Sequence, residues 1–183
     1  MVAKDDYVIV LDFLPHGKPT DRRGEPIAQV IGEQFFNLLE IVVKEGVGLK
    51  TGDRIYVGPE KRDHVKYIRS RISYNDLTNF AKSELENVVE ELMSKNEKRF
   101  VEFFNQAGPI TTRLHSLELL PGIGKKHMWA IINERKKKPF ENFSDLRKRV
   151  EMLPDPRKII MRRILDELEG KDKYRLFVAS GRK

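Results

Sequence analysis

The most informative stretch of this sequence is LELLPGIGKK, residues 117–126, which a helical pattern follows as far as Arg135. Its apolar residues predict a helix that ends at Leu120, after which a Pro-Gly-Ile-Gly turn reverses the chain. A second helix is expected to begin at Lys125. Because the first N–H groups of a helix have no partner inside it, such a helix start is typical of an anion-binding site.

The residue types in this turn fit an anion site individually. Gly122 and Gly124 permit positive φ angles and carry no Cβ that would keep a phosphate away. Ile123 is expected to fill the apolar seam between the two helices, and Lys125 and Lys126 add positive charge. The alternative interpretation is an ordinary helical hairpin, in which the glycines cap a helix and the lysines are solvated.

On these residues, segment 116–135 resembles the helix-hairpin-helix family. The resemblance implies that the amides of the turn and the basic residues after it hold one phosphate strand without reading bases. Carried over to this chain, the binding residues are Gly122, Ile123, Gly124, Lys125 and Lys126. The resemblance further implies a monovalent cation at three backbone carbonyls, those of Glu118, Leu120 and Ile123.

A second, weaker copy of the pattern follows. Ser144 is expected to cap a helix, the turn falls at Leu153-Pro154-Asp155-Pro156, and Asp155 is the expected cap of the next helix, with Pro156 in its first position. Prolines replace the glycines here, and Asp155 places a negative charge where a phosphate would lie. This turn is therefore predicted to be structural, although Arg157 and Lys158 remain candidates for contact with a nucleic-acid backbone.

The positive charge of the chain is concentrated in the same region. The whole chain has a net charge of +7, to which residues 111–183 contribute +9, residues 1–73 contribute +1 and residues 74–110 contribute −3. This distribution is expected if phosphate neutralisation supplies much of the binding affinity, and a solubilising surface is the alternative. The run Arg135-Lys136-Lys137-Lys138 lies at the end of the helix that is expected to begin at Lys125. Arg135 and Lys136 are counted among the residues that bind the nucleic acid.

Residues 1–73 predict β structure. Segments rich in Val, Ile and aromatic residues cover Tyr7 to Leu14, Ile27 to Ile31, Phe35 to Val43, Arg54 to Val57 and Val65 to Ile72. Five short strands predict a small barrel similar to the OB fold. Strict alternation in the last strand would place Val65, Tyr67, Arg69 and Arg71 on one face. There, Tyr67, Arg69 and Arg71 would form a stacking and phosphate platform, with an ordinary exposed strand face as the alternative.

The rest of the chain completes an α+β fold. Residues 74–110 are predicted to form connecting helices, residues 111–170 a tandem helix-hairpin-helix domain with a degenerate second hairpin, and residues 171–183 a C-terminal strand and a tail. The strand, Tyr174 to Ala179, is expected to return to the barrel, and Gly181 to Lys183 to form the tail.

Composition excludes several functional classes. The absence of cysteine excludes disulfides and thiolate chemistry, and the four histidines are too scattered to indicate a metal site. Neither a nucleotide-binding fingerprint nor a catalytic triad is present, so no cofactor and no small-molecule substrate are expected. Glu134-Arg135-Lys136 is similar to a nuclease element and Asp145 to a glycosylase acid, but both lack the required context. A non-enzymatic, cytoplasmic protein without membrane contact is predicted.

Together, the predicted barrel and hairpins resemble an uncharacterised archaeal family, a domain of unknown function predicted to bind RNA. This resemblance implies a binding protein and favours RNA over DNA, with structured RNA such as ribosomal RNA as a candidate partner. The hairpin alone would favour duplex DNA across its minor groove. The competing class is a protein-interaction module, in which the basic face meets an acidic partner.

Overall fold

The computed structural model describes residues 3–179 of the chain, which divide into two compact units. Residues 3–88 and 167–179 form the first unit, and residues 89–166 form the second. Two helices, α1 (Asn79–Lys95) and α5 (Pro156–Leu168), each begin in one unit and end in the other. The chain is thus a mixed α+β protein, and each unit is described by itself.

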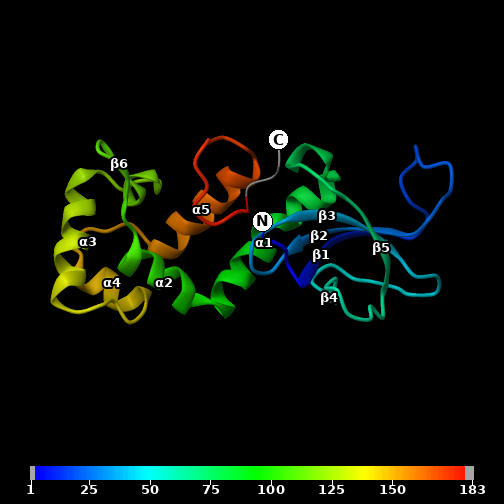
Figure 1. The fold of residues 1–183 in the computed structure, drawn as a ribbon, viewed down its shortest axis with the longest axis horizontal. Coiled ribbons are helices and arrows are strands. Elements are labelled where there is room, and N and C mark those ends of the chain that lie inside the picture. Colours follow the sequence, from blue (N-terminus) through cyan, green and yellow to red (C-terminus); the bar gives the residue numbers. More distant parts are fainter. Residues whose placement is uncertain (1–2, 180–183) are drawn as a thin grey trace. The chain divides into compact units, whose positions relative to one another are not determined.

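The first unit is built on five antiparallel strands that curl into a half-barrel (Figure 1). The strands are β1 (Tyr7–Leu14), β2 (Ile27–Gly32), β3 (Leu38–Val43), β4 (Arg54–Tyr56) and β5 (Val65–Arg71). Their order across the sheet is β4-β1-β2-β3-β5, so two strands that follow each other in sequence form its two edges. The five strands predicted from the sequence are confirmed.

Both faces of this sheet are covered within the first unit. One face carries an apolar cluster that includes Val8, Val30 and Ile41, all fully buried. On the other face, the buried side chain of Gln29 meets the residues before α1: its Nε2 donates to the Asp76 carbonyl at 3.0 Å, and its Oε1 accepts from the Thr78 amide at 2.8 Å. These two bonds connect the short 3-10 helix η1 (Tyr74–Asp76) and the start of α1 to the centre of the sheet.

Strand β5 does not alternate as predicted. Its pairing with β3 shifts register twice. Residues two apart in β3 therefore lie opposite residues three apart in β5, in the pairs Leu39 with Arg71, Ile41 with Ile68 and Val43 with Val65. Each bulge inserts one residue and thereby reverses the face of those that follow. Arg71 therefore shares the core face of the sheet with Val65 and Ile68, whereas Tyr67 lies on the opposite face. The prediction of one common face was wrong.

The C-terminal segment returns to the half-barrel without forming the predicted strand. The buried carboxylate of Glu167 accepts hydrogen bonds from three consecutive amides, those of Leu176, Phe177 and Val178, at 2.9–3.1 Å. Successive amides of a strand point in opposite directions, so three that converge on one oxygen require a curled backbone. The chain then reaches the turn between β2 and β3, where the Ala179 amide donates to the Phe35 carbonyl at 3.0 Å. The predicted tail from Gly181 lies outside the described residues.

The second unit is helical. After α1 it contains α2 (Glu97–Gln106), a small hairpin of β6 (Pro109–Thr111) and β7 (Leu114–His115), the 3-10 helix η2 (Ser116–Leu119), α3 (Lys125–Lys137), α4 (Phe143–Arg149) and the greater part of α5. Its fully buried residues include Phe104, Leu117, Ile131, Leu146 and Ile160. These come from α2, η2, α3, α4 and α5, so all five elements contribute to the interior of this unit.

We expect Glu167→Ala to lower the free energy of unfolding by about 2–4 kcal/mol, because three amides, two of them in buried residues, lose their acceptor. Urea denaturation of the full chain measures this loss. Glu86→Ala, which removes an exposed carboxylate from α1, is the control and should change stability by less than about 0.5 kcal/mol. Equal stability of the two variants would contradict the role given to Glu167.

Candidate nucleic-acid interface

The segment predicted to be a phosphate clamp forms a tight turn between η2 and α3. Helix α3 begins at Lys125, as predicted, with Gly124 as its N-cap. The amide of Ile123 donates to the Leu120 carbonyl at 3.1 Å, and the side chain of Ile123 is buried. The element before the turn is a 3-10 helix of four residues that ends at Leu119, one residue before the predicted end, and the β6–β7 hairpin precedes it as far as His115.

The two glycines of the turn have different structural roles. Gly122 has φ +78°, and a Cβ there would lie 3.7 Å from Cγ of Pro154, so the turns of the two predicted hairpins lie side by side. Gly124 has φ −93°, which any residue can adopt, and a Cβ there would meet no atom within 4 Å. The backbone thus requires glycine at Gly122, while Gly124 leaves open space beside the start of α3.

The start of α3 differs from the starts of the other helices. Thr78 caps α1, Asn142 caps α4 and Asp155 caps α5 through side-chain oxygens, and α2 has Glu97 in its first turn. Helix α3 has neither a side-chain cap nor an acidic residue in its first turn. Among helices α1–α5, α3 alone lacks both a capping side chain and an acidic residue in its first turn. The helix dipole favours an anion at its first amides.

The second hairpin confirms part of the prediction. Helix α5 begins at Pro156, and Oδ1 of Asp155 accepts from the Arg157 amide at 3.1 Å, so the chain's own carboxylate occupies this helix start. Helix α4 begins two residues earlier than expected: its cap is Asn142, whose Oδ1 accepts from the Asp145 amide at 2.7 Å, and Ser144 lies inside the helix. The turn before α5 therefore supplies an anion, the Asp155 carboxylate, to its own helix start, and the turn before α3 supplies none.

The lysines around the first turn point to solvent. Lys125 lies 3.4 Å from Glu118, whose pKa is held low mainly by the hydrogen bond from the His115 amide and also by Lys125. Lys126 and Lys136 are exposed and have no ion-pair partner within residues 3–179. Glu118 partly neutralises the charge of Lys125. The exposed and unpaired positive charge next to the start of α3, which no side chain caps, is therefore that of Lys126.

Sequence reasoning missed Trp129, the single tryptophan, which is 56% exposed on α3. Lys126, Trp129, Asn133 and Lys136 follow one another at intervals of three or four residues, and all four are exposed, so they share one face of the helix. We call this set the α3 stripe. The spacing was visible in the sequence, but it does not distinguish an exposed Trp from a core residue.

The arginines of the basic region are largely used inside the protein. Arg135 donates to the carbonyls of Phe104 and Ala107, at 3.1 and 2.8 Å, and its partial burial lowers its pKa. Its Nη1 thus closes the C-terminal end of α2. Arg157 lies 3.5 Å from both Ser94 and Glu97, whereas its neighbour Lys158 is exposed.

The predicted platform on β5 is not brought together. The hydroxyl of Tyr67 donates to Glu25 at 3.0 Å, and Arg69 pairs with Asp21, Glu40 and Glu25 at 2.8, 3.3 and 3.4 Å. Arg71 lies on the other face and donates to the Ala179 carbonyl. The bulges of β5 cause the separation, and the acidic neighbours neutralise the charge of Arg69, whose pKa they raise.

Few of the described residues are candidates for binding a metal ion or for crossing a membrane. The carbonyl of Leu120, one of the three expected to hold a monovalent cation, already accepts from Ile123, and the cation stays a prediction. Within residues 3–179, no three His, Asp or Glu side chains are grouped so as to hold a metal ion. In the same part of the chain, no helix is long and apolar enough to cross a membrane.

Comparison with known proteins gives concordant matches. The model of a family described as "Protein of unknown function (DUF655)" matches residues 4–179. An uncharacterised protein of Methanocaldococcus jannaschii is 50% identical over 176 residues, which are 95% of this chain and 80% of that protein. A crystal structure from Archaeoglobus fulgidus, titled as a member of the same family, is 49% identical, has a TM-score of 0.86, and covers 96% of this chain and 100% of its own.

We expect Arg135→Ala to lower the free energy of unfolding by about 2–4 kcal/mol, because two carbonyls at the end of α2 lose a charged donor. The matched control is Lys136→Ala, which removes the next, exposed charge and should change stability by less than about 0.5 kcal/mol. Thermal and urea denaturation measure both. A stability loss confined to the Lys136 variant would contradict the assignment of Arg135 to the interior.

Stability should fall on acidification through His115. Its Nδ1 accepts from the Leu117 amide, and burial, followed by the nearby Arg135, lowers its pKa. Because the folded state then binds the proton more weakly than the unfolded state, this contribution is complete above the unfolded pKa of about 6.5 and is lost as pH falls through the lower folded value.

The test compares urea unfolding of the wild type and of His115→Asn at about pH 7.5 and about pH 5. Asn can accept the same amide hydrogen bond but does not titrate in this range. We expect the wild type to lose more free energy of unfolding between the two pH values than the variant does. Identical losses would show that His115 does not contribute to the pH dependence.

Proposed function

The chain belongs to the DUF655 family of uncharacterised proteins, and from its geometry we propose that it is a non-enzymatic nucleic-acid-binding protein. In this proposal the first hairpin grips the phosphate backbone without reading bases. The favoured ligand is RNA, with structured RNA such as ribosomal RNA as a candidate, and a cytoplasmic location fits such a partner. The OB-like half-barrel and the helix-hairpin-helix character of residues 111–170 are parts of the same proposal.

The observation that carries the proposal is the contrast between two neighbouring helix starts. At α5 the carboxylate of Asp155 binds the Arg157 amide, whereas at α3 no side chain of the described residues binds the amides of Lys125, Lys126 and His127. Gly124 adds no Cβ that would fill the space beside them. A phosphate oxygen is of the same chemical kind as the Asp155 carboxylate oxygen, so α3 offers to an external anion the site that α5 fills internally.

The α3 stripe supports a nucleic acid over an isolated phosphate. Lys126 and Lys136 lie on one exposed helix face, separated by two turns of helix or more, and Trp129 lies between them. A chain of phosphates can meet both lysines, and an unpaired base or a sugar can lie on the indole. Such contacts tolerate any sequence, which agrees with a clamp that reads no bases.

The half-barrel contributes a weaker argument. Its five strands form a curled sheet that is open between the edge strands β4 and β5, which is similar to the partly open, five-stranded OB barrel. Many OB barrels bind single strands, which favours RNA or single-stranded DNA. The acidic partners of Tyr67 and Arg69 on β5 make that face a poor phosphate platform, so the proposal gives the main contact to the hairpin.

The alternatives are a duplex-DNA binder and a protein-interaction module that use the same hairpin. Duplex DNA would meet the same open amides across its minor groove. An acidic protein partner would respond mainly to the lysine charges, because a diffuse electrostatic contact does not depend on access to individual amides. A substitution at Gly124 distinguishes a phosphate bound by the amides from a diffuse charge contact, because it changes access to the first amides of α3 without changing the charge of the protein.

We expect Gly124→Val to weaken RNA binding about tenfold or more, since the branched side chain keeps a phosphate from amides that would each give a charge-assisted bond worth about 1.5–3 kcal/mol. The fold should survive, because φ −93° suits Val and the space is open. Loss of the glycine cap costs about 1 kcal/mol of stability at most. Fluorescence anisotropy with labelled single-stranded RNA, hairpin RNA, single-stranded DNA and duplex DNA measures the effect.

Two charge reversals complete this experiment. Lys126→Glu should weaken binding and reduce the slope of log K against log salt by about 1–2, whereas Lys98→Glu, an exposed lysine on α2, should have little effect. If the Gly124 variant binds every nucleic acid as the wild type does, the amide clamp is wrong. If the wild type binds none of them, the protein-interaction module becomes the better explanation.

A further inference from the structure

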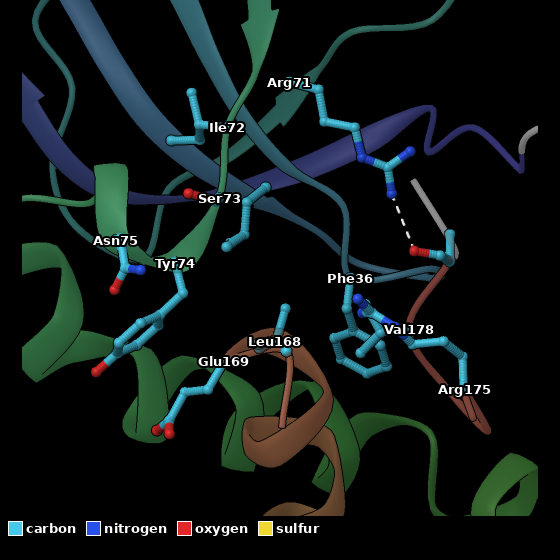
Figure 2. Close-up of a pocket in the computed structure, with 13 residues that line it drawn as sticks. Phe36, Arg71, Ile72, Ser73, Tyr74, Asn75, Leu168, Glu169, Arg175 and Val178 are labelled. Carbon is cyan, nitrogen blue, oxygen red and sulfur yellow. Dashed lines mark hydrogen bonds between the residues drawn. The ribbon is translucent and has the colours of Figure 1, made fainter. Parts of the chain in front are cut away.

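A second candidate site lies in the first unit and shares no residue with the hairpin. It is a pocket of about 410 Å³ between the end of β5 with η1 and the C-terminal segment that Glu167 anchors (Figure 2). Its volume is within the range of about 300–1,000 Å³ in which small ligands bind. Figure 2 shows Arg71 and Arg175 on one side of the pocket and Tyr74 and Asn75 on the other.

Among residues 3–179, neither arginine of this pocket has a carboxylate partner. Arg71 donates from Nη2 to the Ala179 carbonyl at 3.0 Å, and Arg175 donates from Nη1 to the Glu167 carbonyl at 2.8 Å. Each guanidinium has five N–H donors, so most of them remain unused among residues 3–179. The carbonyl bonds hold each side chain at the pocket but leave its charge uncompensated.

Both arginines are exposed residues, so solvent screens part of the repulsion between their like charges. Partial burial, followed by repulsion from Arg175, lowers the pKa of Arg71, and Asp5 opposes this only as the smallest contribution. The carboxylate of Asp5 is already used by the amides of Gln34 and Phe35, both at 2.8 Å. Asp5 does not line the pocket; among the residues that do, Glu169 carries a carboxylate, and it pairs with Lys171 at 2.6 Å. An external anion between the arginines would relieve the repulsion.

The remaining walls are suited to an organic group. Phe36, Leu168 and Val178 line the pocket and are 1%, 8% and 6% exposed. On the side opposite the arginines, the half-buried ring of Tyr74 lies beside the amide side chain of Asn75. An aromatic ring next to an amide can stack on a planar heterocycle and hydrogen-bond to its edge. The pocket thus has a cationic end, an apolar wall and an aromatic, polar end.

We propose that this pocket binds a phosphate monoester of mononucleotide size, with its phosphate between Arg71 and Arg175 and its planar group toward Tyr74 and Asn75. A monoester has two negative charges and three terminal oxygens, which matches two guanidinium forks better than a diester does. The ligand is either a free mononucleotide or the phosphorylated end of a nucleic-acid strand. The proposal does not depend on the hairpin, because all its residues belong to the first unit.

Isothermal titration calorimetry of the full chain with 5′-AMP tests this proposal, with adenosine and inorganic phosphate as part-ligands. We expect saturable binding of 5′-AMP that weakens about tenfold or more in Arg71→Gln/Arg175→Gln, because two charge-assisted contacts are lost. Arg22→Gln, which removes an exposed arginine of the same unit, should bind as the wild type does. Equal affinity of the double variant, or no saturable binding to the wild type at millimolar 5′-AMP, would overturn the proposal.

Two further measurements complete the test. A short RNA with a 5′-phosphate and the same RNA with a 5′-hydroxyl are compared in the Gly124→Val background, where the hairpin contact is weakened. A preference for the phosphorylated end that the arginine substitutions abolish identifies a strand end, whereas equal binding together with 5′-AMP binding identifies a free mononucleotide.

If the double variant does not fold, amide chemical shifts of the wild type replace it. Titration with 5′-AMP should then move the resonances of Ser73, Tyr74 and Val178, while those of residues 124–127 stay in place. Shifts confined to residues 124–127 would assign the phosphate to the hairpin and reject the pocket.

Discussion

The backbone groups at helix ends need partners, and the way the chain supplies them organises the second unit. Arginines bind the carbonyl ends: Arg135 closes α2, Arg149 bonds to the last carbonyls of α3 at Glu134 and Lys138, and Arg163 bonds to the Leu119 carbonyl of η2. Side-chain oxygens or acidic residues serve the amide ends of α1, α2, α4 and α5. The start of α3 receives neither. The proposed function depends on that one exception.

The same constraint divides the positive charge of the chain into two parts. The guanidiniums of Arg135, Arg149 and Arg163 point inward to carbonyls, since a fork of donors can bind several acceptors at once. Lys126, Lys136 and Lys158 point to solvent, where a flexible ammonium retains its hydration. The net charge of +9 in residues 111–183 therefore overstates the charge that faces a ligand, and the lysines near α3 form the smaller, relevant part.

Local signals in the sequence predicted where the strands and helices lie better than they predicted which side chains share a face of a strand or helix. The five strands, the start of α3 at Lys125 and the start of α5 at Pro156 were predicted, because β-branched residues, glycine and proline act on the nearby backbone. The separation of Tyr67 from Arg71 was missed because the first bulge moves Tyr67 off the face of Val65 and the second returns Arg71 to that face, and no residue type signals a bulge there. The prediction of a strand at Tyr174 was wrong because Glu167, at the end of α5, binds three successive amides of this segment. The carbonyl acceptors of Arg135 were not predicted, because they lie about thirty residues earlier and only the tertiary fold brings them to Arg135.

The most direct test of the open helix start is to follow individual backbone amides while single-stranded RNA is added to the wild-type protein. The account predicts that the amide resonances of Lys125, Lys126 and His127 shift most, and that the amide of Arg157, which Asp155 already binds, shifts little. Shifts concentrated on β5, or equal at α3 and α5, would contradict the claim that the first hairpin is the phosphate-binding element.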